Sequence, residues 1–215
     1  MDYIFRILPN MFSGLGVSAQ IFIFTIVLSL PLGMLLAMVR ISKVGLFRQA
    51  AGAYIYLMRG TPLMLQIMFI YYGLPLIFDL QISDFPAAIL AFVANYAAYF
   101  AEIYRSGIES MPVGQYEAAK VLGYSRVQTF FRIILPQVIK RVLPAVTNEM
   151  ITLVKDTSLA FVLTVTEMFT IAKQIAAAQA SVMPLMAAGV FYYIFNLVVA
   201  VVMEHVEKKL NYYRG

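Results

Sequence analysis

The feature that most constrains this chain is an uncharged stretch from Ile7 to Val39. A helix needs about 20 largely apolar residues to cross the hydrocarbon core of a bilayer. The stretch is far longer than the roughly 7–15 apolar residues of a cleavable signal peptide, and no small-residue cleavage site follows it. We therefore expect it to remain in the protein as a membrane-spanning helix.

Four further segments are long and apolar enough to cross a membrane. Hydrophobic residues make up 62% of the chain and charged residues 13%, against roughly 45–50% and 25% in soluble domains. This composition excludes an ordinary soluble enzyme and a disordered protein. The predicted fold is an all-α polytopic membrane protein, a single transmembrane domain over residues 1–215 with spans at about 15–39, 60–78, 85–104, 144–169 and 184–203.

Basic residues gather in two connectors, 40–59 and 105–141, and in the tail after His205. The short turn at 79–84 holds two aspartates and no base. Because cytoplasmic loops carry an excess of Lys and Arg, we expect both connectors and the carboxyl terminus inside and the amino terminus outside. The net charge of +5 then needs no nucleic acid, and no basic face interleaved with aromatics is present.

The two basic connectors contain helical patterns. Residues 44–58 place aromatic and aliphatic side chains between basic ends, which predicts a helix in the cytoplasmic interface. Residues 114–122 predict a short helix that ends at Gly123, and a second amphipathic stretch at 127–134 leads to Pro136. Such a unit can either dock in a groove on a partner or serve as a plain amphipathic connector.

The second connector contains the most informative motif, QYEAAKVLGYSRVQTFFRIILPQ at 115–137. It resembles the EAA loop of the permease subunits of ABC importers. RGTPLMLQIMFIYYGLP at 59–75, NYAAYFAEIYRSGIESMPVGQYEAAKVLG at 95–123 and LVKDTSLAFVLTVTEM at 153–168 resemble the polar-amino-acid subfamily. Together these segments cover the chain from about residue 15 to 205.

The resemblance implies a permease in the cytoplasmic membrane that moves amino acids by alternating access. Its expected partners are two cytoplasmic ABC ATPase subunits, a second permease subunit that is identical or related, an extracytoplasmic amino-acid-binding protein and membrane lipid. The coupling helix that docks on the ATPase is expected to include Glu117, Ala118, Ala119 and Gly123.

Several chemistries are excluded by residue type. The chain has no cysteine and one histidine, His205, so it offers no thiol, disulfide or multi-histidine metal site. It has no GxxxxGK[ST] phosphate loop. We expect no enzyme activity and no cofactor in this chain, and we expect ATP and magnesium to bind the partner ATPase.

Polar residues inside the expected spans are the candidates for substrate contact, because intramembrane ionisable groups tend to face a cavity or each other. If the third span runs inward and the fourth outward, Asn95 and residues 155–158 lie at a similar depth. Glu102 follows Asn95 by nearly two helical turns on the same face. The full candidate set is Asn95, Tyr96, Tyr99, Glu102, Lys155, Asp156, Thr157 and Ser158.

Structural roles remain open for the same residues. Lys155 and Asp156 can pair with each other, Asn95 can link two helices, and Glu102 can pair with Arg105. The tyrosines can be packing residues, and Glu149 is expected to be structural because it lies near the cytoplasmic end.

Two carboxylates in a cavity favour a cationic substrate side chain, so arginine, lysine or histidine is the predicted cargo. Backbone amides at a broken helix near 155–158 are expected to hold its carboxylate. The alternatives are another polar amino acid such as glutamine or cystine or, in a different class, a passive channel or a membrane anchor.

Overall fold

The computed structural model describes residues 2–210, and these residues form helices joined by short loops, with no strand among them. This confirms the all-α prediction. The helices are α1 (Asp2–Arg40), α2 (Gly45–Gly60), α3 (Leu63–Met68), the π-helix η1 (Phe69–Gly73), α4 (Leu74–Phe78), α5 (Asp84–Glu109), α6 (Val113–Val121), α7 (Arg126–Thr129), the π-helix η2 (Phe130–Ile134), α8 (Leu135–Asp156), the 3-10 helix η3 (Thr157–Leu163), α9 (Met168–Gln179) and α10 (Met183–Leu210).

Three described helices are each long and apolar enough to cross a membrane: α1 from Leu8, α5 and α10. The count rises to five if each of two bent helix pairs forms one span, namely Gly45–Gly60 with Leu63–Phe78 and Arg126–Leu163 with Met168–Gln179. The predicted number of spans therefore corresponds to the upper count.

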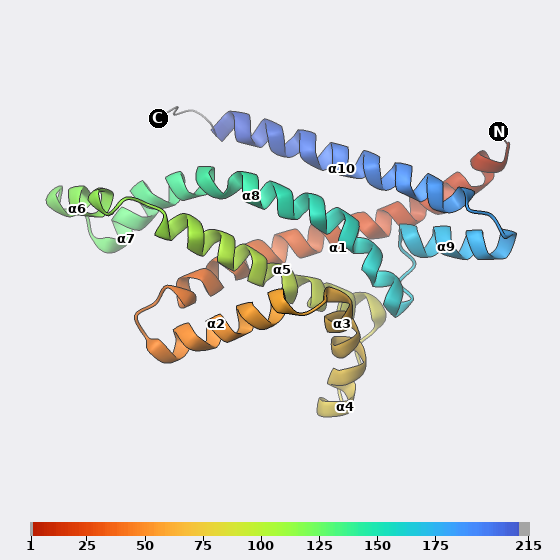
Figure 1. Cartoon of the computed structure of the whole chain (residues 1–215), viewed down its shortest axis with the longest axis horizontal. Coiled ribbons are helices and arrows are strands. Elements are labelled where there is room, and N and C mark those ends of the chain that lie inside the picture. The colour runs from red at the N-terminus through yellow and green to blue at the C-terminus, as the bar shows by residue number, and fades with distance from the viewer. Residues whose placement is uncertain (1, 211–215) are drawn as a thin grey trace.

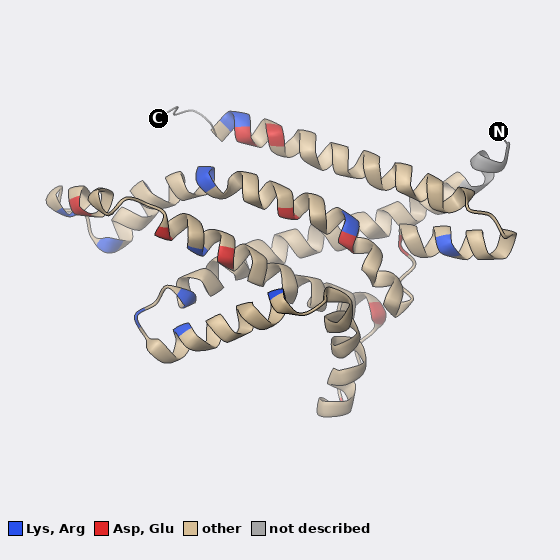
Figure 2. Cartoon of the chain, viewed as in Figure 1, with Lys and Arg blue, Asp and Glu red and all other residues tan. Residues whose placement is uncertain are grey.

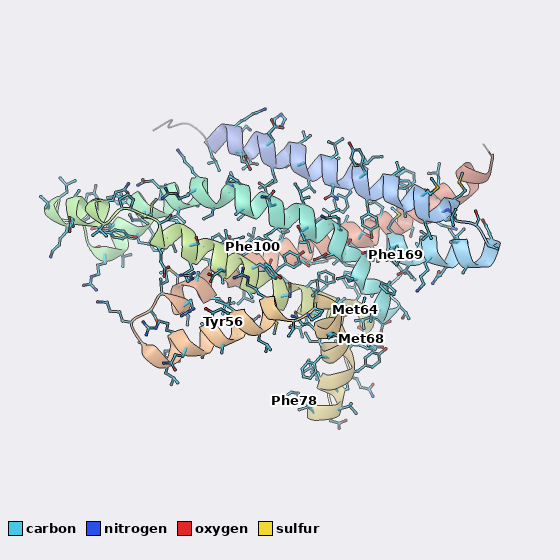
Figure 3. The ribbon with its side chains drawn as sticks, in the orientation of Figure 1. Tyr56, Met64, Met68, Phe78, Phe100 and Phe169 are labelled. Atoms are coloured by element: carbon cyan, nitrogen blue, oxygen red, sulfur yellow. The ribbon has the colours of Figure 1, made fainter. Side chains whose placement is uncertain are left out.

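Helix α5 occupies the centre of the bundle, with 61% of its most apolar window buried against 11% for α10 (Figure 1). It packs most extensively against α1. The contact is close because small residues line it: a Cβ added at Gly33 of α1 would lie 2.7 Å from the Cβ of Phe100. Small residues let membrane helices approach closely, and Phe100 is fully buried in this core (Figure 3).

The region predicted as the second span begins at a sharp bend, which separates it from the helix predicted at 44–58. Helix α2 ends at Gly60, and the segment Leu63–Phe78 departs from it at 110°. Pro62, in the extended conformation, precedes the new helix and cannot continue the old one. The resulting arm of α3, η1 and α4 points away from the bundle, and Phe78 near its tip is 68% exposed (Figure 3).

The region predicted as the fourth span differs from expectation at both ends. Helix begins at Arg126 rather than near Pro144, and Pro144 lies inside α8. The chain then breaks inside the expected span at Thr164, which has a φ of 59°. Residues 170–183 were expected as a connector, but most of them belong to α9, which departs at 58°.

The second connector folds as its pattern indicates. Helix α6 ends in a turn at Gly123, whose φ of +78° is in the left-handed region that favours glycine. The amide of Tyr124 donates to the carbonyl of Ala119 at 3.0 Å and closes the turn. Most Lys and Arg residues lie in the half of the molecule that contains α6, α7 and the α1–α2 loop (Figure 2).

Candidate functional site

Helices α5 and α8 meet through a hydrogen bond between two predicted site residues. The hydroxyl of Tyr96 donates to Oδ2 of Asp156 at 2.8 Å. Tyr96 is buried, whereas Asp156 is half-buried. Within the part of the chain that the structure describes, Tyr96 is the one hydrogen-bond donor to this carboxylate. Asp156 therefore retains capacity to accept hydrogen bonds from another group.

Asn95 is adjacent in sequence to Tyr96 but contacts α2 and α3 instead of Asp156. Its Nδ2 donates to the carbonyl of Met58 at 3.0 Å and to Oε1 of Gln66 at 2.9 Å. Gln66 in turn donates to Oγ1 of Thr61 at 2.7 Å. Asn95 is thus a helix-to-helix link that holds the bend between α2 and α3. Sequence reasoning did not identify its partner Gln66.

Tyr99 and Glu102 line a cavity of about 470 Å³ between α5 and α8, a size that suits a small ligand. Arg59 lies over the Tyr99 ring, with its guanidinium carbon 5.3 Å from the ring centre. Glu102 accepts from Nε of Arg105 at 3.0 Å and forms an ion pair with it. The charge of Glu102 is therefore compensated within its own helix.

Glu149 also lines this cavity, although the sequence suggested a structural role for it. It precedes Asp156 by seven residues on the same helix, so the two side chains lie on the same face about two turns apart. A face with two carboxylates consequently extends along α8 from the cavity to the Tyr96 contact.

The other residues near the end of α8 make local contacts. Lys155 is exposed and belongs to none of the ion pairs that the described side chains form. Oγ1 of Thr157 donates to the carbonyl of Val154 at 2.8 Å, and Oγ of Ser158 donates to that of Lys155 at 2.7 Å. These hydroxyls satisfy carbonyls at a helix end.

The backbone at 155–158 does not support the expected site for the carboxylate of the substrate. The amide of Thr157 already donates to the carbonyls of Leu153 and Lys155, because the segment continues as a 3-10 helix instead of starting a new one. The nearest new helix start is at Met168, and there Glu167 caps the amides of Phe169 and Thr170 at 2.8 and 2.7 Å.

Glu167 has a structural role that the sequence did not predict. It is fully buried. Beyond the two amides, it accepts from Oγ1 of Thr170 at 3.0 Å, Oγ of Ser18 at 3.3 Å and the hydroxyl of Tyr192 at 2.7 Å. The carboxylate thereby joins α1, α9 and α10 at the break in the chain. Its position in the motif offered no signal for these distant partners.

Three of the predicted coupling residues, Glu117, Ala118 and Ala119, lie on α6 at the basic end of the molecule, and Gly123 lies in the turn that follows it. Glu117 and Ala118 are exposed, whereas Ala119 is 1% exposed and faces inward. The side-chain amides of Gln115 and Gln137 bond to each other at 2.8 and 2.7 Å. This pair links α6 to α8, the helix that carries Asp156.

Metal binding finds no support in the described residues, where no group of three or more His, Asp or Glu side chains could hold an ion.

Several relatives of the chain are named as amino-acid transport proteins. It is 37% identical over 95% of its length, and 94% of the relative, to the "Arginine transport system permease protein ArtQ" of Bacillus subtilis. It is 34% identical to the "L-cystine transport system permease protein TcyB" of the same organism, over 95% of this chain and 88% of that one. It is 30% identical to the "Putative glutamine transport system permease protein GlnP" of Rickettsia typhi, over 98% of both chains.

Solved structures show the same architecture. A chain of an amino acid ABC transporter crystallised with histidines superposes with a TM-score of 0.88 and 29% identity, covering 96% of this chain and 97% of that one. The MetNI methionine transporter shares the fold with a TM-score of 0.76 at 18% identity, over 98% of this chain and 99% of that one.

The family described as "Binding-protein-dependent transport system inner membrane component" matches residues 29–212. The resemblance drawn from the motifs is confirmed, and the chain belongs to this family of inner-membrane transport components.

Proposed function

We propose that this chain is the transmembrane permease subunit of an ATP-driven importer of amino acids and that it prefers basic ones. The relatives described above support amino acids as the substrate class, since their names include arginine, cystine and glutamine. Because those names also include neutral amino acids, the proposed preference for basic ones depends on the residues of this chain.

The observation that supports the preference is the environment of Asp156, a half-buried carboxylate that accepts a single hydrogen bond among the residues that the structure describes. Glu149 lies on the same face of α8. A charge in a poorly solvated site requires a partner, and a guanidinium or ammonium group on the substrate supplies one. Glu102 is omitted from this role because Arg105 already pairs with it.

Coupling to ATP is proposed to pass through α6. Two ABC ATPase subunits bind the exposed helices of two paired permeases, and an extracytoplasmic binding protein delivers the amino acid. The exposure of Glu117 and the Gln115–Gln137 link to α8 support this route. Closure of the ATPase pair then moves α8 and exposes Asp156 to alternate sides of the membrane.

The experiment is uptake by the reconstituted permease–ATPase complex, tested with a panel of labelled amino acids. We expect ATP-dependent uptake with arginine, lysine or histidine carried best. Preference for glutamine or cystine would overturn the basic assignment alone. Uptake that needs no ATP would favour a passive channel, and a complex without any uptake would favour a membrane anchor.

The coupling role is tested by Gly123→Val, with Gly114→Val as the matched control. Gly123 has a positive φ that a β-branched residue tolerates poorly, whereas Gly114 has helical geometry and open space around it. We expect only the first variant to lose ATPase association or substrate-stimulated hydrolysis. Normal coupling in it would reduce α6 to an ordinary connector.

The orientation is tested with single cysteines at two exposed serines, since the chain has no native cysteine. Cysteine at Ser83 should react with an impermeant thiol reagent from outside, and cysteine at Ser125 only from inside. Labelling of the second from outside would reverse the proposed topology.

A further inference from the structure

A second cavity of about 1000 Å³ lies beside the coupling helix. One wall comes from the last turn of α1 and the loop after it, and the other from α6, α7 and η2. These elements meet at the basic end of the molecule (Figure 2). Its lining includes Ile41, Lys43, Lys120, Arg126, Phe130 and Phe131.

The charged groups of this lining all have the same sign. Lys43, Lys120 and Arg126 line the cavity, and no carboxylate does. None of the three belongs to an ion pair among the side chains that the structure describes. Lys120 lacks such a pair even though Glu117 stands one turn before it on α6. The cavity is therefore an unneutralised cationic site.

The rest of the lining is largely apolar and is joined to the membrane-crossing helices. Ile41 directly follows α1. Phe130 and Phe131 belong to the continuous helix Arg126–Leu163, and the Phe131 side chain is 61% exposed. The cavity consequently lies where two spans reach the membrane boundary, with apolar side chains next to three cations.

We propose that this cavity binds an anionic phospholipid. Its phosphate group accepts hydrogen bonds from Lys43, Lys120 and Arg126, and its acyl chains lie along Ile41 and the two phenylalanines. Basic pockets between membrane helices on the cytoplasmic side bind anionic head groups in this way. A free phosphate ion would contact the basic residues and leave the apolar side chains of the lining uncovered. A phospholipid contacts both, through its head group and its acyl chains.

The site has a consequence for coupling. Lys120 stands on α6, whereas Lys43 follows α1, so one head group bridges the coupling helix to the first span. The bound lipid stabilises the position of α6 whatever amino acid is carried, and its test is therefore independent of the substrate assignment.

The experiment uses the full permease–ATPase complex, delipidated in detergent, with phosphatidylglycerol or phosphatidylcholine added back. Native mass spectrometry counts the retained lipid, and thermal unfolding reports stabilisation by ligand. We expect phosphatidylglycerol to be retained and to raise the unfolding temperature more than phosphatidylcholine. Equal retention of the two lipids would overturn the proposal.

The site is located with the triple variant Lys43→Gln, Lys120→Gln, Arg126→Gln. Its matched control is Arg48→Gln, Arg132→Gln, Lys209→Gln, three exposed basic residues outside the cavity. The cavity variant should lose affinity for phosphatidylglycerol by on the order of 100-fold, since each basic group near an anionic surface contributes about fivefold. Equal losses in both variants, or full retention of lipid with loss of the ATPase from the cavity variant, would contradict a lipid site.

A measurement on the parent chain covers the case in which the triple variant does not fold. Photoactivatable phosphatidylglycerol should crosslink to peptides from 38–43 or 116–131, and excess inorganic phosphate should not displace it. Crosslinks confined to other helices, or displacement by phosphate alone, would overturn the assignment.

Discussion

Asp156 and Glu167 are two membrane carboxylates eleven positions apart in the chain, yet their surroundings differ. Glu167 is fully buried and accepts hydrogen bonds from two amides and three hydroxyls. Asp156 is half-buried and accepts one, from Tyr96. The first carboxylate is saturated by the protein, and the second retains capacity for a substrate.

The difference arises from where the chain breaks. A new helix starts after Glu167, and its unpaired amides attract a capping carboxylate. Asp156 lies where α8 passes into the 3-10 helix η3, so the backbone offers it no free amides. A carboxylate inside a predicted span is therefore weak evidence for substrate contact until its local donors are known.

The largest expected effect is the loss of stability caused by the substitution Glu167→Ala. The change removes the acceptor of two amides and of the Thr170 and Tyr192 hydroxyls, whereas the Ser18 hydroxyl keeps the carbonyl of Gly14. Each buried group left unsatisfied costs about 1–3 kcal/mol, so we expect a loss of at least about 3 kcal/mol in the free energy of unfolding. Denaturant unfolding in detergent measures it, with Glu117→Ala as an exposed control. A loss below about 1 kcal/mol would show that this hydrogen-bond network does not stabilise the chain break before α9.

A smaller effect, on arginine uptake, is expected for the double variant Lys155→Met, Asp156→Asn. If Asp156 serves only to balance Lys155, the double variant should regain the transport that Asp156→Asn loses. Because Lys155 is exposed and forms no ion pair with Asp156, we expect no rescue and arginine uptake still reduced about tenfold, a change of about 1.4 kcal/mol. Recovery to the parent rate would assign Asp156 a structural role.

The smallest effects come from two matched hydroxyl deletions, Tyr96→Phe and Tyr192→Phe. Each removes one hydrogen bond to a carboxylate and should cost about 0.5–1.5 kcal/mol of stability. Only Tyr96→Phe should alter the KM for arginine, because it removes the one hydrogen bond that Asp156 accepts from the described residues. An equal KM change in both variants would remove the proposed distinction between the two carboxylates.

Local signals were sufficient to predict helices in the regions of α1, α5, α10 and α6. Long apolar runs predict helices in a bilayer wherever they occur, and Gly123 ends α6 in the expected turn. The 110° bend before Leu63 lies at the boundary between the helices predicted at 44–58 and 60–78, but its angle was not predicted, and neither was the break at Thr164. They depend on contacts such as Asn95 with Gln66 and Glu167 with Ser18, which join residues far apart in the sequence.

The candidate site was predictable only in part. The proximity of Tyr96 and Asp156 followed from the expected depths of two spans. Glu102 and Glu149 both line the cavity. Arg105 pairs with Glu102, as one of the alternatives allowed, and Glu149 lies on the face of α8 that carries Asp156. Helical spacing identifies which residues share a face, but pairing on a second helix requires the packed structure.

The central claim, that Asp156 selects a cationic side chain, is tested most directly by the ratio of arginine to glutamine uptake in the reconstituted complex. Asp156→Asn keeps the size of the side chain and removes its charge, and Glu102→Gln makes the same change at a carboxylate paired with Arg105. A charge-assisted hydrogen bond is worth about 1.5–3 kcal/mol, so the ratio should fall at least about tenfold in Asp156→Asn and less than about threefold in Glu102→Gln. An unchanged ratio in Asp156→Asn, with the complex intact, would contradict the claim.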